Sequence, residues 1–127
     1  EGCYISFYES YKQHMIYEKK PVFPVLQMVM GLIKKHTGTD VRKTRPIDLI
    51  DRVKVPFLFI CGEKDPFSLP EKSRMLFEKC GSQHKEIVWF SEGTHSHLRI
   101  SNEAGFDQAI DDFLDGVCQE KLIPERD

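Results

Sequence analysis

The fold is decided by the stretch VPFLFICGEKD, residues 55–65. Its first part is a continuous apolar run that is too short for a helix and lacks the alternation of a half-buried strand. This pattern is typical of a strand buried on both faces, as in a parallel sheet. Pro56 is compatible with a strand only near its beginning. We therefore expect a buried strand that ends at Gly62 and is followed by a polar loop.

A second unit of the same kind follows this strand. Residues 86–90, EIVWF, have the composition of another strand, and an amphipathic helix is expected before it. Ser68 and Glu71 have the spacing of a capping box in which Ser68 caps that helix, and Gly81 would end it. A further amphipathic helix is expected over residues 101–117. Its inner face would carry Phe106, Ala109, Ile110, Phe113 and Val117. Because helices return the chain between strands, we expect an α/β fold with parallel strands and right-handed crossovers.

The first third of the sequence has a different pattern. Residues 7–36 are expected to form two helices separated by Pro21 and Pro24, and Gly38 stands where a helix would end. The second helix is apolar on more than one face, so it should be buried on more than one side or should line a cavity. From residue 45 the pattern is denser, and Pro46 can open a short helix. We divide the chain into a helical segment, residues 1–44, and an α/β unit, residues 45–127.

Composition and charge exclude several classes of protein. The chain has 127 residues, of which 40% are hydrophobic and 30% charged, and its formal net charge is −2. These values suit one globular domain and give no support to a nucleic acid or an anionic membrane as partner. The longest apolar stretch, residues 21–33, is shorter than the roughly 20 residues of a spanning helix, so no transmembrane segment is expected. The sequence starts without an initiating Met or a signal-peptide pattern, which suggests a fragment or a processed product.

The cysteines show no metal-binding pattern. They stand at positions 3, 61, 80 and 118, without a C-x-x-C pair or a zinc-type spacing to a histidine. Cys61 falls in the apolar strand, and Cys80 and Cys118 fall on apolar helix faces. We therefore expect small buried side chains in a reducing, cytoplasmic compartment, with neither a metal nor a cofactor.

Two loops should carry the chemistry, because ligands of open α/β sheets lie beyond the carboxyl ends of the strands. Asp65 lies four residues after Cys61, and His95 lies five residues after Phe90. Adjacent parallel strands are about 4.8 Å apart, so we expect the two side chains to meet at roughly 2.6–3.2 Å. A carboxylate at this distance fixes the tautomer of the imidazole and stabilises the imidazolium. Acyl-transfer chemistry needs such a pair and a nucleophile.

Simpler interpretations remain open for both residues. Asp65 could only hold backbone amides of its own loop, and His95 could be a surface residue with His97 as its competitor. Glu63 and Glu92 lie too close to their strand ends to reach across. The remaining histidines are expected at the surface or at helix ends, and they are His14, His36 and His84.

Three segments together resemble the α/β-hydrolase superfamily. VPFLFICGEKD resembles the acid-bearing strand and turn, SEGTH at residues 91–95 resembles the histidine loop, and RPID at residues 45–48 resembles the lead-in to the acid strand. The resemblance is closest to the serine aminopeptidase-like and acyl-esterase branches and covers about residues 40–118. It implies that the chain is the C-terminal part of this fold, with Asp65 as the triad acid, His95 as the general base and the helical segment as a cap.

The nucleophile of the triad is not in this sequence. In α/β-hydrolases the serine precedes the acid and lies on a G-x-S-x-G turn. That motif is absent here, and the upstream serines, Ser6 and Ser10, have no glycines beside them. The resemblance therefore implies a serine hydrolase for an ester, thioester, amide or peptide bond whose serine lies upstream, in a missing N-terminal part of the fold. We expect the partner to be a small-molecule or peptide acyl substrate and the chain alone to be inactive.

Two other functions remain open at this point. A chain without its nucleophile could be a non-catalytic scaffold or interaction subunit, because a fold does not fix a function. Acyl transfer to an acceptor other than water would use the same Asp65 and His95.

Overall fold

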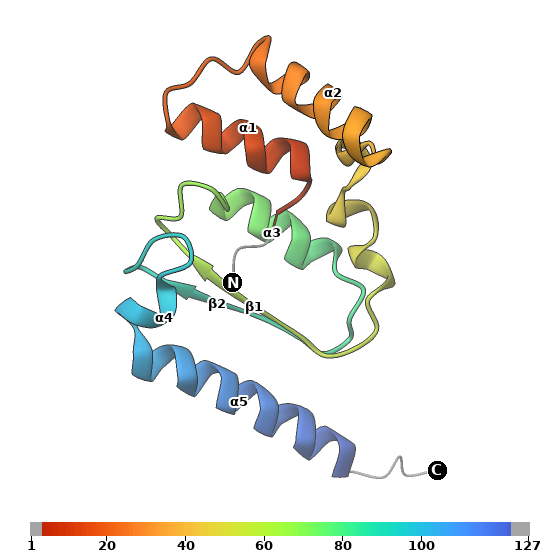
Figure 1. The fold of residues 1–127 in the computed structure, drawn as a ribbon. Helices are drawn as coiled ribbons and strands as arrows, with labels where there is room; N and C mark the ends of the chain where they lie inside the picture. Colours follow the sequence, from red (N-terminus) through yellow and green to blue (C-terminus); the bar gives the residue numbers. More distant parts are fainter. Residues whose placement is uncertain (1–3, 123–127) are drawn as a thin grey trace.

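The computed structural model describes residues 4–122 and the side chains of residues 4–119. Figure 1 shows a small sheet with helices on both sides. The elements are α1 (Phe7–Tyr17), α2 (Val25–Thr37), three short 3₁₀ turns (Val41–Lys43, Pro46–Asp48, Ile50–Arg52), β1 (Phe57–Gly62), α3 (Pro70–Lys79), β2 (Lys85–Phe90), α4 (Leu98–Ser101) and α5 (Glu103–Leu122).

The two strands of the described chain are parallel, as the sequence predicted. Their register runs from Phe57 opposite Lys85 to Gly62 opposite Phe90. The backbone amide of Glu63 donates to the carbonyl of Phe90 at 2.9 Å, which extends the pairing just past the end of β1. Both strands therefore end at the same edge of the sheet, and the loops that follow them leave from neighbouring points.

Alternate side chains of β1 enter two different cores. Phe59 and Cys61 pack with Leu76 and Cys80 of the α3 side. Ile60, on the other face, packs with Leu98 of α4 and Phe106 of α5. A strand with helices on both faces needs apolar residues at every position, which explains the unbroken run in the sequence.

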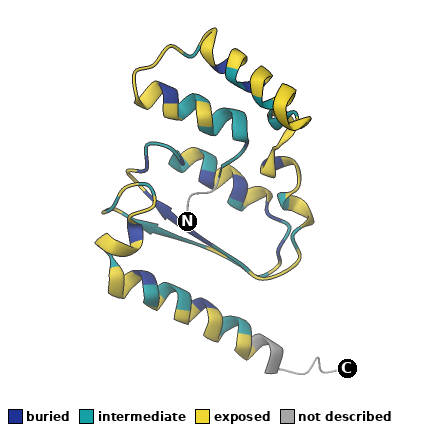
Figure 2. Cartoon of the chain, viewed as in Figure 1, coloured by how far each residue is buried: buried dark blue, intermediate teal, exposed yellow. Residues whose placement is uncertain are grey.

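The N-terminal segment is helical, and the connection that contains Pro21 and Pro24 separates α1 from α2. Gly38 ends α2 in the left-handed conformation, with φ +72°. Leu26 and Met30 of α2 pack against Met15 of α1 in a separate small core. The expectation that α2 is buried on more than one side is wrong for the described chain, because its other apolar face is exposed (Figure 2).

The predicted capping box is also wrong. The residue that precedes α3 is Leu69, and Pro70 occupies the first turn, where a missing N–H costs nothing. No side chain caps this helix. Ser68 is buried, and its backbone amide donates to Asp65. The chain therefore uses Ser68 to shape the loop before the helix, and Pro70 sets the point at which α3 begins.

Three further expectations need correction. The short helix predicted after Pro46 is a pair of 3₁₀ turns, whereas the helix predicted over residues 101–117 is confirmed as α5, with the short α4 before it. Cys118 is exposed, whereas Cys61 and Cys80 are buried, and Cys3 lies outside the described residues. His84 packs edge-on against Phe113 of α5 instead of lying free at the surface.

Candidate active site

Asp65 and His95 meet beyond the ends of the two strands. Nδ1 of His95 lies 2.9 Å from Oδ2 of Asp65, within the distance expected from the sequence. The Asp65 side chain is 3% exposed and that of His95 is 20% exposed. The carboxylate is thus enclosed, while the imidazole keeps one side accessible.

The second oxygen of Asp65 organises its own loop. Oδ1 accepts hydrogen bonds from the backbone amides of Phe67, at 2.8 Å, and Ser68, at 2.9 Å. Both interpretations of Asp65 therefore apply together, because one oxygen holds the loop and the other contacts the imidazole. With three hydrogen bonds on one carboxylate, the position of the acid is fixed by the fold.

The histidine loop turns sharply on either side of His95. Gly93 has φ +97° and Ser96 has φ +61°. His97, the competitor in the sequence, is exposed, and its Nδ1 donates to the carbonyl of His95 at 2.9 Å. His95 contacts the acid, and His97 does not. Glu63 is also exposed, in agreement with the argument that it lies too near the end of its strand.

The two loops are joined by polar contacts. Lys64 and Glu92 form an exposed ion pair at 3.0 Å, one residue from each loop. Asn102 donates to the carbonyl of Glu92 at 2.7 Å and to that of Leu98 at 2.9 Å. These contacts hold the histidine loop against both the acid loop and the start of α5.

Tyr4 contacts the other nitrogen of His95. Because the carboxylate of Asp65 only accepts, the proton of the neutral imidazole lies on Nδ1 and the lone pair on Nε2. Tyr4 Oη lies 2.8 Å from Nε2 and donates to it. Sequence reasoning missed this residue, since no local pattern marks a contact between positions 91 residues apart.

A largely aromatic cavity opens in front of His95. It has a volume of about 330 Å³ and is lined by Tyr4, Ser10, Tyr11, His14, Phe67 and His95. Phe67 packs edge-on against His95 at 5.2 Å between ring centroids and lies 5.1 Å from His14. Sequence reasoning placed His14 at the surface, and it is exposed, but it also lines this cavity. The spacing of Tyr11 and His14, one helical turn apart, is the signal that would have identified this wall.

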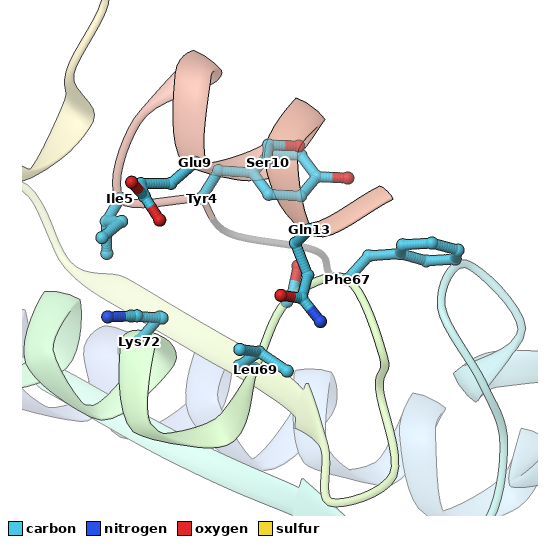
Figure 3. Close-up of a pocket in the computed structure, with 9 residues that line it drawn as sticks. Tyr4, Ile5, Glu9, Ser10, Gln13, Phe67, Leu69 and Lys72 are labelled. Carbon is cyan, nitrogen blue, oxygen red and sulfur yellow. The ribbon is translucent and has the colours of Figure 1, made fainter. Parts of the chain in front are cut away.

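A smaller cavity lies beside the first one. Its volume is about 30 Å³, enough for about one water molecule. Figure 3 shows it between α1 and the start of α3, with Gln13 extending from α1 toward the acid loop. Nε2 of Gln13 donates to the carbonyl of Pro66 at 3.0 Å, so α1 is tied directly to that loop.

Neither a metal site nor a membrane span occurs in the described part of the chain. Residues 4–122 contain no group of three or more His, Cys, Asp or Glu side chains placed to hold a metal ion. Within the same residues, no helix is both long and apolar enough to cross a bilayer.

Comparison with known proteins identifies the family. The profile of the family described as serine aminopeptidase, S33, matches residues 29–102, which include both Asp65 and His95. The chain belongs to this family of α/β-hydrolases. The two parallel strands with helices on both faces are compatible with part of the α/β-hydrolase fold.

Curated relatives support the same assignment. The chain is 39% identical over 96 residues to protein bem46 of Schizosaccharomyces pombe, a match that covers 75% of this chain and 31% of bem46. It is 24% identical over 98 residues to the uncharacterized protein YqkD of Bacillus subtilis, covering 76% of this chain and 32% of YqkD. It is 39% identical over 61 residues to the uncharacterized membrane protein YNL320W of Saccharomyces cerevisiae, covering 48% of this chain and 21% of that protein.

The chain spans about a third or less of the length of these relatives. No solved structure gives a significant match. The family is of the serine hydrolase type, and its chemistry requires a nucleophile besides the acid and the histidine.

Proposed function

We propose that Asp65 and His95 are the acid and the general base of a serine hydrolase, acting with a serine that lies upstream of these 127 residues. The observation that carries this proposal is the 2.9 Å contact between the buried Asp65 carboxylate and Nδ1 of His95, whose imidazole lines the cavity and accepts from Tyr4 at Nε2. In this geometry a third group orients the base, and its other nitrogen would serve the nucleophile once the Tyr4 hydroxyl is displaced.

Each residue would have a defined part in the reaction. The serine hydroxyl attacks the acyl carbon of an ester, thioester or amide, and Nε2 of His95 takes the hydroxyl proton. The same proton then passes to the leaving group, and water repeats the cycle. Asp65 keeps the imidazole in the correct tautomer and stabilises its charged form. Backbone amides near the serine would hold the oxyanion.

The cavity in front of His95 would take the acyl part of the substrate. Its wall is mainly aromatic, with Tyr11 and His14 from α1 and Phe67 from the acid loop. We propose that residues 1–44 act as the cap of this cavity, since α1 forms one side of it. A small-molecule or peptide acyl substrate fits these features without a metal or another cofactor.

A chimera tests the catalytic assignment. This chain would be joined to the part of an S33-family member that carries a G-x-S-x-G turn, and hydrolysis of p-nitrophenyl esters would be measured. Asp65→Asn should lower kcat on the order of a thousandfold or more, because it holds the wrong tautomer. His95→Ala should cause a loss of similar size, whereas His97→Ala, the matched control, should lower kcat far less.

The outcomes separate the possible functions. Full activity after His95→Ala would refute the mechanism. A chimera that folds but neither hydrolyses esters nor reacts with a fluorophosphonate at its serine would favour the non-catalytic scaffold. Faster consumption of ester with an added alcohol or amine, with the acyl group recovered on that acceptor, would identify acyl transfer.

A further inference from the structure

We propose that the outer face of α2 docks onto a membrane surface that contains anionic lipids. The patch, called the α2 face below, consists of Phe23, two residues before the helix begins, and of Val25, Met28 and Leu32 on the outer side of α2. Their exposed fractions are 77%, 38%, 63% and 54%. The inference goes beyond the proposed hydrolase activity and does not depend on it.

The α2 face is apolar in a place where a surface helix is normally polar. The opposite side of α2 already packs on α1, through the fully buried Leu26 and Met30. A helix whose inner side is buried usually presents charged or polar residues to water. A row of large apolar side chains on the outside marks an interaction site instead.

The position of α2 in the molecule leaves this face free to meet a flat surface. Figure 1 shows α2 at the edge of the molecule, with α1 between it and the sheet. Figure 2 shows the outer side of α2 as exposed along most of its length. A side chain added at Gly31 would meet nothing within 4 Å, so the helix backbone itself is accessible there.

Basic residues flank the α2 face on both ends. From Met15 to Asp40 the chain carries four lysines and two acidic residues, Glu18, which pairs with Lys20 at 3.8 Å, and Asp40, which pairs with Lys34 at 3.5 Å. The lysines are Lys19, Lys20, Lys34 and Lys35, and all are exposed. Lys35 follows Leu32 by three residues and Met28 by seven, so it lies on the same side of the helix. Its apolar stem can lie along the α2 face while its ammonium group reaches lipid phosphates.

The distribution of charge over the whole chain would orient it on such a surface. Residues 1–45 contain eight Lys and Arg against four Asp and Glu, whereas residues 46–127 contain ten against sixteen. The overall charge of −2 hides this asymmetry, which is why composition gave no support to an anionic membrane. An anionic surface attracts the basic α2 side and repels the acidic remainder.

These features favour lipid over a protein partner. An apolar face of Met, Leu, Val and Phe with lysines at its borders is the pattern of a helix that lies in the membrane interface. Such a helix gains binding from apolar burial and from anionic headgroups together, so both contributions can be tested separately.

Vesicle flotation tests the proposal with the 127-residue chain, because aggregates sink while vesicle-bound protein rises. The chain should float with vesicles of phosphatidylcholine mixed with phosphatidylserine and not with phosphatidylcholine alone. Met28→Asp and Leu32→Asp should each abolish flotation. The double variant Lys34→Glu/Lys35→Glu should weaken binding by about 25-fold or more, since each basic residue near the surface contributes about fivefold.

A matched control is Ile100→Asp, which places the same charge at an apolar residue that is 78% exposed on α4. This variant should float like the unmodified chain, and far-UV circular dichroism should show that all variants keep their helices. Failure to float with anionic vesicles, equal flotation with neutral vesicles, or equal loss in Ile100→Asp would overturn the proposal. A dimer that Met28→Asp separates, without any vesicle binding, would show a protein interface and would also overturn it.

Discussion

The phenol of Tyr4 occupies the nitrogen of His95 that a catalytic hydroxyl would need. Nε2 has one lone pair, and in this structure it accepts from Tyr4 Oη at 2.8 Å. A serine hydroxyl can therefore bind Nε2 only after the hydrogen bond from Tyr4 has broken. Tyr4 thus controls how available the imidazole is to any electrophile or donor that enters the cavity.

Removing that hydroxyl should make His95 more reactive. In Tyr4→Phe we expect diethyl pyrocarbonate to modify His95 about two to ten times faster, the range that corresponds to one hydrogen bond. Mass spectrometry of peptides would assign the rate to His95 rather than to the other histidines. Tyr11→Phe, in the wall of the same cavity, should not change the rate. An equal rate in the Tyr4→Phe variant would mean that the contact is not maintained in solution.

Gly93 and Gly31 should respond to alanine in opposite directions. At Gly93 the backbone has φ +97°, and a Cβ would lie 3.1 Å from Cα of Leu98. Gly93→Ala should lower the free energy of unfolding by about 1–3 kcal/mol. Gly31 lies in the middle of α2 on its exposed side, and Gly31→Ala should raise the free energy of unfolding by about 0.5–1 kcal/mol. Urea unfolding followed by circular dichroism measures both, and shifts of the same sign would contradict the expectation.

At the scale of elements, the sequence predicted those helices and strands whose burial requires apolar residues along a continuous stretch. The run that became β1 could be recognised because a strand covered on both faces tolerates no polar position. Because Asp65 and His95 lie just beyond the ends of two adjacent parallel strands, their contact could be predicted. The roles of Tyr4 and Phe67 could not be predicted, because they depend on how the N-terminal segment folds back over the loops.

Local sequence motifs gave a wrong prediction where two motifs pointed to different starts of the same helix. Ser68 and Glu71 have the spacing of a capping box, but Pro70 also fits the first turn of a helix, and the carboxylate of Asp65 takes the amide of Ser68. The sequence of α2 is apolar on two sides, and this pattern is the same whether the second side is buried or exposed to solvent.

Besides the buried contact of Leu98 with Phe106, an ion pair joins α4 to α5, and this pair predicts that stability depends on pH. Nε and Nη2 of Arg99 donate to the two oxygens of Asp107 at 2.7 and 2.8 Å. Hydrogen bonds from Arg99 lower the pKa of the Asp107 carboxyl. A lowered pKa means that the stabilisation is present above the unfolded-state pKa, about 4, and is lost as the pH falls through the folded-state pKa.

Asp107→Asn should therefore lower the urea midpoint by a constant amount between about pH 5 and pH 8. The difference from the unmodified chain should shrink as the pH falls below about 4. Asp112→Asn is the control, because the partner of Asp112 is the neutral Gln108. A difference for Asp107→Asn that grows on acidification would reverse the sign and refute the argument.

The molecule as a whole exposes more surface than its mass requires. Its accessible area is 8755 Å², whereas a folded chain of 14.8 kDa exposes about 7,000 Å². In the described part of the chain, most buried apolar residues form three separate clusters, with the small one of α1 and α2 apart from the two that flank the sheet. Each cluster is small, so packing in one cluster contributes little to the stability of the others.

The 127-residue chain on its own should be poorly stable. The two-stranded sheet of the described residues leaves one edge of the apolar strand β1 without a neighbouring strand, which favours aggregation. We expect a broad thermal transition and light scattering that increases with concentration. Circular dichroism and scattering at two concentrations measure this. A sharp, reversible transition of a monomer would contradict it.

The carboxylate of Asp65 serves the loop and the imidazole at the same time, with one oxygen for each. Any event that withdraws it must release both partners together, so local opening of this loop and loss of the His95 contact form one cooperative fluctuation. The amide protons of Phe67 and Ser68 would then exchange with solvent at a common rate set by that opening. Their exchange rate, measured in heavy water, would report how often the imidazole is left without its acid, even in a chain that turns over no substrate.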